Sequence, residues 1–283
     1  MTTGPTAFVF AGGGSLGAVQ VGMLRALVEA GLRPDFVVGS SAGAINAAYF
    51  AGAPDLDGVA RLERIWSGLK RADIFPVSWS HIVRLLRRPD YIVEPDGLRR
   101  LIETHLHFQN FEDARLPLHI MATDQQGMSV RLSSGSVMDA ILASAAIPGV
   151  FPTVPIGGRH LMDGAIAANT PLRLAVELGA TRIVILPTGY SCALEGPPKG
   201  VIGRTLHAIT LLIAWQLMQE LEALPDTIQV HMAPALCPLN VSPYDFSVAP
   251  QLIERATQTT RQWIVDGGLE RRAHAHELSA HHH

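Results

Sequence analysis

The sequence predicts an α/β fold in which helices cover a mainly parallel β-sheet. Two units of the same order, strand then glycine loop then helix, follow each other in the first fifty residues. In the first, the apolar residues 7–10 precede Gly12-Gly13-Gly14 and a helical pattern. In the second, residues 36–38 precede Gly39-Ser40-Ser41-Ala42-Gly43 and an alanine-rich helix. Neighbouring parallel strands need such crossover connections, so the repeated unit indicates a parallel sheet.

Later segments continue the alternation of strands and helices. Residues 118–122 and 183–186 are short apolar runs typical of buried strands. Helical spacing of apolar residues is found in four segments, 137–146, 171–178, 205–224 and 252–265. Within the third, residues 206–218 are strongly apolar but too short to span a bilayer, so we expect a buried core helix there.

Residues 55–115 contain helical patterns without a convincing buried strand, which predicts an inserted helical cap. Residues 82–88 combine apolar residues with arginine. This pattern suits either a lipid-facing helix or, as the simpler interpretation, a solvated helix face. No low-complexity linker divides the chain, so we expect a single domain over residues 1–283. Residues 272–283 form a polar tail whose closing histidines resemble a purification tag.

Composition restricts the partners. A formal net charge of −3 without a basic patch argues against nucleic acid, and 48% hydrophobic residues indicate a folded, globular chain. The first residues lack the basic region of a signal peptide, which favours a cytoplasmic protein. Cys192 and Cys237 are far apart and lack metal-ligand spacing, so we expect free thiols and no metal site.

Ser41 is the candidate nucleophile. Gly39-x-Ser41-x-Gly43 lies directly after an expected strand and before an expected helix, which is the context of a nucleophile elbow. Glycines two positions before and after the serine permit the sharp turn that exposes its hydroxyl. Ser40 is the neighbouring hydroxyl, but its place in the motif directs its side chain elsewhere.

The run Gly12-Gly13-Gly14 is open to two interpretations. Consecutive glycine N–H groups can bind the oxyanion that forms during acyl transfer. Alternatively, Gly12, Gly14 and Gly17 fit a dinucleotide-binding loop, and Asp35 follows at about the required distance. The serine elbow after the next strand has no role in a dinucleotide site, so it favours the oxyanion hole.

The base that activates the serine is less evident from sequence. Histidines usually serve, but none has a motif context, and we expect structural or surface roles for His81, His105, His107, His119, His160, His207 and His231. A carboxylate can serve instead. Asp163-Gly164-Ala165 precedes a helix that opens at Pro171, and such a loop can orient a carboxylate, although Asp-Gly is also a common turn.

Together these motifs resemble the patatin-like phospholipase family. The resemblance rests on the glycine loop, the serine elbow about thirty residues later and the distant Asp163-Gly164-Ala165, and covers about residues 7–171. The stretch 143–152 and Asn169-x-Pro171 are also similar to family motifs.

The resemblance implies a three-layer α/β/α sandwich and a Ser-Asp dyad that cleaves acyl esters of phospholipids, lysophospholipids or related lipids. It implies Ser41 as nucleophile, Asp163 as base, Gly12, Gly13 and Gly14 as oxyanion donors, and no cofactor. The expected partners are a lipid ester and, peripherally, a membrane; the oligomeric state is not predicted.

One departure from the family pattern keeps other functions open. The family loop commonly has Arg or Lys before its last glycine, whereas this chain has Leu16 before Gly17. An acyltransferase that uses the same serine is one alternative. A lipid-binding or regulatory protein with little catalytic activity is another, and Leu16 supports it.

Overall fold

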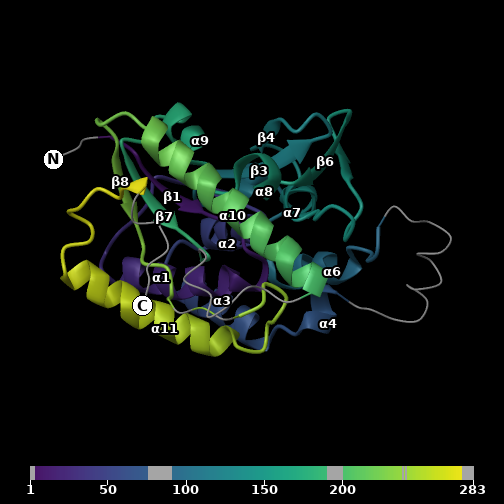
Figure 1. Ribbon diagram of the computed structural model, residues 1–283, viewed down its shortest axis with the longest axis horizontal. Coiled ribbons are helices and arrows are strands. Elements are labelled where there is room, and N and C mark those ends of the chain that lie inside the picture. Colours follow the sequence, from purple (N-terminus) through teal and green to yellow (C-terminus); the bar gives the residue numbers. More distant parts are fainter. Residues whose placement is uncertain (1–3, 76–90, 190–199, 238, 240, 276–283) are drawn as a thin grey trace.

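One β-sheet forms the centre of the protein (Figure 1). The structure, a computed structural model, describes residues 4–75, 91–189, 200–237, 239 and 241–275. The strands of the sheet are β1 (Thr6–Phe10), β2 (Phe36–Ser40), β3 (Leu118–Asp124), β4 (Ser129–Leu132), β5 (Val154–Ile156), β6 (Arg159–Asp163), β7 (Arg182–Leu186) and β8 (Gln229–Met232). Their order is β5-β6-β3-β2-β1-β7-β8, and β4 pairs with β3 off this path. The strands from β3 to β8 in this order are parallel, whereas β4, β5 and β6 are joined by antiparallel pairs.

Helices cover both faces of this sheet. They are α1 (Gly17–Glu29), α2 (Ala42–Gly52), α3 (Leu56–Gly68), α4 (Arg71–Ile74), α6 (Asp96–His105), α7 (Val137–Ser144), α8 (Ala165–Ala168), α9 (Leu172–Glu177), α10 (Gly200–Ala223) and α11 (Ala249–Val265), with single 3-10 turns η1 (Gly14–Leu16) and η2 (Phe111–Asp113). Phe8 and Phe10 of β1 pack in one core with α1, α2, α3 and α11. Ala7 and Val9, which alternate with them, pack in a second core with α9 and α10. The predicted three-layer α/β/α sandwich with a mainly parallel sheet is therefore confirmed.

The local structure differs from the sequence prediction at β6 and at α10. No strand was predicted at Leu161 and Met162, yet both belong to β6, which ends at Asp163. The helix expected at residues 205–224 is present as α10, but the prediction of a buried core helix is wrong for one of its faces, because Leu212 is 66% exposed. The cap expected at 55–115 corresponds to α3, α4, α6 and η2, while residues 82–88 lie outside the described part of the chain.

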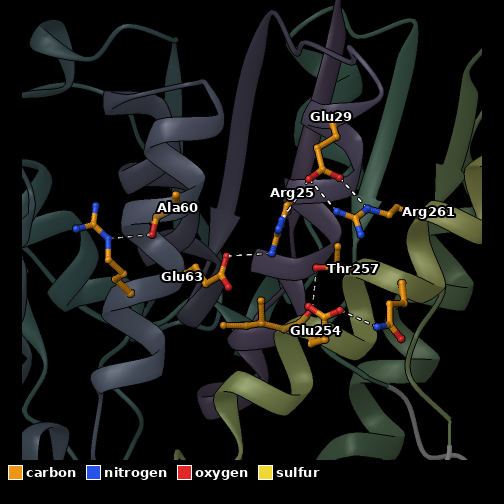
Figure 2. Close-up of polar contacts among 10 residues, drawn as sticks. Arg25, Glu29, Ala60, Glu63, Glu254, Thr257 and Arg261 are labelled. Carbon is orange, nitrogen blue, oxygen red and sulfur yellow. Dashed lines mark hydrogen bonds and ion pairs between the residues drawn. The ribbon is translucent and has the colours of Figure 1, made fainter.

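Helix α11, near the end of the chain, is packed against α1, near its beginning. Gly22 permits this approach, because a Cβ atom there would overlap the carbonyl oxygen of Ile253. At the surface, Glu29 of α1 accepts two hydrogen bonds from Arg261 of α11, at 2.8 and 2.9 Å (Figure 2). Arg25 lies between Glu29 and Glu63 of α3. The last third of the chain therefore contributes to the same core as the first.

The described residues also bear on the expectations about location. Among them, no helix has the length and apolar character needed to cross a membrane. The prediction of free thiols is wrong at Cys237, which is disulfide-bonded; Cys192 lies outside the described residues. Disulfides are rare in reducing compartments, so the cysteines give no support to a cytoplasmic location. The expected polar tail, residues 272–283, is described only up to residue 275. Within this part, Ala273 is buried, and its N–H donates to the carbonyl of Val230.

Candidate active site

Ser41 lies at the turn between β2 and α2. Its φ of 53° and ψ of −124° make it the only non-glycine residue with positive φ in the described part of the chain. The flanking glycines are required by close packing of the backbone. A Cβ atom on Gly39 would overlap the carbonyl of Gly43, and one on Gly43 would overlap the carbonyl of Phe10. The expected elbow therefore has a geometric basis in the fold.

Asp163 is the hydrogen-bond partner of this serine. The Ser41 hydroxyl donates to Asp163 Oδ2 at 2.8 Å, and the N–H of Ala165 donates to Oδ1 at 2.8 Å. The two residues are 122 positions apart. They meet because β2 and β6 both pair with β3, which places Asp163 near the carboxyl end of β2. Thr123 of β3 holds the aspartate backbone by donating to its carbonyl oxygen.

Burial determines the electrostatics of this pair. Ser41 and Asp163 are 7% and 4% exposed. Removal from water disfavours the carboxylate and raises the pKa of Asp163 from 3.8 to about 6, although the hydrogen bonds from Ala165 and Ser41 oppose this rise. At neutral pH the side chain is thus ionised, yet it is a stronger base than an exposed aspartate.

The three glycines expected to bind an oxyanion differ in their hydrogen bonds. The Gly12 N–H donates to the carbonyl of Asn169 at 3.1 Å, so it is occupied. Within the described residues, the N–H groups of Gly13 and Gly14 have no hydrogen-bond acceptor. The loop passes beside Ser41, since a Cβ atom on Gly12 would lie 3.1 Å from Ser41 Cβ. The structure therefore narrows the set of available donors to Gly13 and Gly14.

A buried polar network supports this glycine loop. Gln20 of α1 donates to the carbonyl of Ala11, which directly follows β1, and to the carbonyl of Leu186, the last residue of β7. Asn46 of α2 donates to Gln20 and accepts from the Trp66 indole of α3. These side chains connect the loop to three helices. Sequence reasoning missed them because their partners lie far away in the chain.

Ser144, at the end of α7, is a second residue whose role was missed. Its hydroxyl accepts the N–H of Ser41 at 2.8 Å and donates to the carbonyl of Met121. It therefore holds the backbone of Ser41, whose hydroxyl bonds instead to Asp163. Its position within the family-like stretch 143–152 was the available signal. Sequence reasoning also missed Tyr244. Burial raises the pKa of its phenol hydroxyl, and the nearby negative charge of Asp163 raises this pKa further.

An apolar pocket opens beside Ser41. Its volume is about 60 Å³, and large apolar side chains line it, among them Ile45, Leu62, Trp66, Phe75, Phe151 and Phe246. This is room for about two water molecules, so a long acyl chain requires these side chains to move. A larger cavity of about 720 Å³, lined by arginines among others, does not include Ser41. It shares with the pocket the lining residues Leu62, Ile65, Leu69 and Leu101.

The described histidines lie elsewhere. His231 Nδ1 bonds to the carbonyl of Arg271, His160 lies near Thr153, and His119 packs edge-on against Phe36. His105 and His107 line the larger cavity. The side chains of His81 and His207 are outside the described residues. Among the side chains that the structure describes, the Ser41 hydroxyl thus donates its hydrogen bond to Asp163 and not to a histidine. No group of three or more metal-ligating side chains is found among them.

Comparison with known proteins identifies the family of this chain. The model of the patatin-like phospholipase family matches residues 8–176, more than half of the chain. The chain belongs to the patatin-like phospholipase family. That match contains both members of the Ser41–Asp163 pair and all three glycines of the loop. The resemblance inferred from the motifs is therefore confirmed.

Individual members of the patatin-like phospholipase family are distant from this chain. A patatin-like phospholipase domain-containing protein of Caenorhabditis elegans is 30% identical over 195 residues, 68% of this chain and 17% of that protein. An NTE family protein of Mycobacterium tuberculosis is 34% identical over 164 residues, 58% of this chain and 27% of that protein. The chain thus spans less than a third of the length of these relatives. Among solved structures, VipD from Legionella pneumophila overlaps with a TM-score of 0.49 at 16% identity, covering 94% of this chain and 67% of that one.

Proposed function

We propose that this protein is a serine hydrolase that cleaves acyl ester bonds of lipids through a Ser41–Asp163 dyad. The observation that carries the proposal is the 2.8 Å hydrogen bond from Ser41 Oγ to Asp163 Oδ2 in a buried site. Membership of the patatin-like phospholipase family supports a lipid ester as substrate. The apolar lining of the pocket beside Ser41 suits an acyl chain.

In the proposed reaction, Asp163 accepts the proton of Ser41 as the serine oxygen attacks the ester carbonyl. The N–H groups of Gly13 and Gly14 stabilise the oxyanion. The alcohol leaves with the proton from Asp163, and the acyl group remains on Ser41. Water then gives a proton to Asp163 and attacks the acyl-enzyme, which releases the fatty acid and restores the serine hydroxyl.

Two alternatives to the hydrolase differ from it, one in the molecule that accepts the acyl group and the other in having no turnover. An acyltransferase would transfer the acyl group from Ser41 to an alcohol or thiol instead of water. A lipid-binding protein without turnover was suggested by Leu16, but neutral Leu16 does not disturb the serine–aspartate bond. The contact between nucleophile and base favours a catalytic role over binding alone. A cytoplasmic location and peripheral contact with membranes stay predictions.

Hydrolysis of p-nitrophenyl esters of graded chain length by the wild type and three variants tests the proposal. We expect Ser41→Ala and Asp163→Asn to lose roughly a thousandfold or more in turnover while their circular dichroism stays native. Ser40→Ala is the matched control, because it removes the adjacent buried hydroxyl, which has no hydrogen-bond partner among the residues that the structure describes. It should stay active.

Two results would contradict the dyad: full activity of Asp163→Asn, or loss of activity in Ser40→Ala with Ser41→Ala unaffected. A serine-reactive phosphonate gives an independent measurement. It should label the wild type and Ser40→Ala but not Ser41→Ala. Release of free fatty acid without an added alcohol would distinguish hydrolysis from acyl transfer.

A further inference from the structure

Helix α10 exposes apolar side chains on one face. Ile209, Leu211, Leu212 and Trp215 are about half or more exposed, with Leu212 at 66% and Trp215 at 59%. From Thr205 to Gln219 the sequence contains no Asp, Glu, Lys or Arg. Exposed large apolar side chains grouped in this way mark interaction surfaces more often than isolated ones do.

This surface continues onto the segment that carries the catalytic base. Ile166 of α8 is 45% exposed, and Gln216 of α10 donates to the carbonyl groups of Ile166 and Ala167 at 3.0 and 3.3 Å. The Gln216 side chain also accepts the N–H of Asn169. Figure 1 shows α10 crossing the front of the molecule. We call Ile166, Ile209, Leu211, Leu212 and Trp215 the apolar face.

The opposite side of α10 is anchored to the protein. Leu217 and Leu221 are buried in the second core, which α10 shares with the sheet and α9. Glu220 accepts the N–H groups of Leu172 and Arg173 at the start of α9. The helix therefore has apolar side chains on two sides, one packed against the protein and one exposed. Packing among the described residues does not account for the exposed apolar side chains.

We propose that this protein docks on lipid bilayers through the apolar face. The proposal rests on the proposed function, since a lipid ester substrate is held in a bilayer and the apolar face adjoins the segment after Asp163. Leucine, isoleucine and tryptophan without acidic neighbours suit insertion among lipid headgroups. Docking through this face brings the segment after the catalytic base to the surface from which the substrate must come.

A second copy of the chain fits the apolar face less well. A stable protein interface has about 20 to 30 residues on each side, whereas the apolar face comprises five side chains. A bilayer does not need shape complementarity over a large area, and a few inserted apolar side chains contribute directly to binding. The small size and apolar composition of the face therefore favour lipid.

Co-sedimentation with phosphatidylcholine vesicles tests this docking. The parent is the full chain with Ser41→Ala, so that binding is measured without turnover. We expect Leu212→Gln combined with Trp215→Gln to lower the vesicle partition coefficient at least tenfold, which corresponds to about 1.4 kcal/mol. The matched control is Val265→Gln, which changes a 78% exposed apolar side chain on α11 and should bind like the parent.

Tryptophan fluorescence provides a second measurement. Insertion of Trp215 should shift the emission of the parent to shorter wavelength when vesicles are added. In a Trp215→Phe variant that shift should be lost while vesicle binding is kept, because phenylalanine preserves an apolar side chain. These variants do not alter Ser41 or Asp163, so the same substitutions in the active chain should leave hydrolysis of a water-soluble short-chain ester unchanged.

Three results would overturn the proposal: no vesicle binding by the parent, equal binding by the double variant, or equal loss with Val265→Gln. Dimerisation in analytical ultracentrifugation that the double variant abolishes, without vesicle binding, would assign the face to a second copy. These experiments can refute the membrane docking without refuting the proposed hydrolase activity, and the activity without refuting the docking. Inactivity on soluble esters with normal face-dependent vesicle binding contradicts only the hydrolase, and the reverse pattern contradicts only the docking.

Discussion

Replacement of Asp163 by asparagine should stabilise the protein at alkaline pH while it abolishes activity. The fold raises the pKa of this carboxyl from 3.8 to about 6, mainly by burial. The folded state therefore favours the protonated form, and ionisation of Asp163 lowers the free energy of unfolding. At about 1.36 kcal/mol per pKa unit, the full effect is about 3 kcal/mol.

The two pKa values, 3.8 and about 6, determine the direction of the change in stability and the pH range over which it occurs. Below pH 3.8 the carboxyl is protonated in both states, and the wild type keeps this contribution. As the pH rises through 6 the contribution is lost, whereas an asparagine does not titrate. The stability of Asp163→Asn relative to the wild type should thus increase by most of about 3 kcal/mol between pH 4 and pH 8.

Urea denaturation of both proteins at pH 4 and pH 8 measures this difference. Groups that titrate in both proteins cancel in the comparison. Loss of the hydrogen bond from Ser41 lowers the stability of the variant equally at both pH values, so it does not affect the change with pH. Ser40→Ala, which alters no titratable group, is the control. A stability difference between Asp163→Asn and the wild type that is the same at both pH values would refute the reasoning about burial.

Two further predictions concern activity. Because Asp163 must be ionised to accept a proton, kcat/KM of the wild type should fall as the pH drops through about 6; a profile that is flat from pH 5 to pH 8 would argue against this base. Ser144→Ala removes the acceptor for the Ser41 N–H, and we expect about tenfold lower kcat with the fold retained, since one buried N–H loses its partner. Ser144→Thr, which keeps the hydroxyl, should restore part of the activity, and equal loss in both variants would indicate packing as the cause.

The part of the fold that could be predicted from sequence is the part with strong local signals. Residues 7–10 and 36–38 are fully apolar and are followed by glycine loops, so β1 and β2 and their parallel pairing were expected. Strands β4, β5 and β6 are short and partly exposed, and no periodicity distinguishes them from loops. Their pairing with β3 and with each other is a tertiary property, which local patterns do not encode.

Sequence motifs indicated the candidate site residues, but they did not show that the side chains of these residues are in contact. Ser41 stands in a recognisable turn, whereas Asp163 stands in an Asp-Gly dipeptide that is common in ordinary turns. Only the antiparallel pairing of β3 with β6 brings its carboxylate to the serine. The apolar run of α10 was interpreted as buried because apolar character alone does not show which face of a helix meets the solvent.

The packing of α11 on α1 affects how the catalytic motifs can be inherited or transplanted. The family match ends at residue 176, but β7 completes the pairing of β1 on the side opposite β2, and α11 covers the helix that follows the glycine loop. A fragment that stopped at residue 176 would carry Ser41 and Asp163 with the edge of β1 unpaired, and open strand edges promote aggregation. Mutations far beyond the motifs, for example at Ile253 of α11, which contacts Gly22 of α1, therefore act on the same folding unit as Ser41 and Asp163. A chimaera that takes these motifs from this protein would therefore have to include the helix near the end of the chain as well.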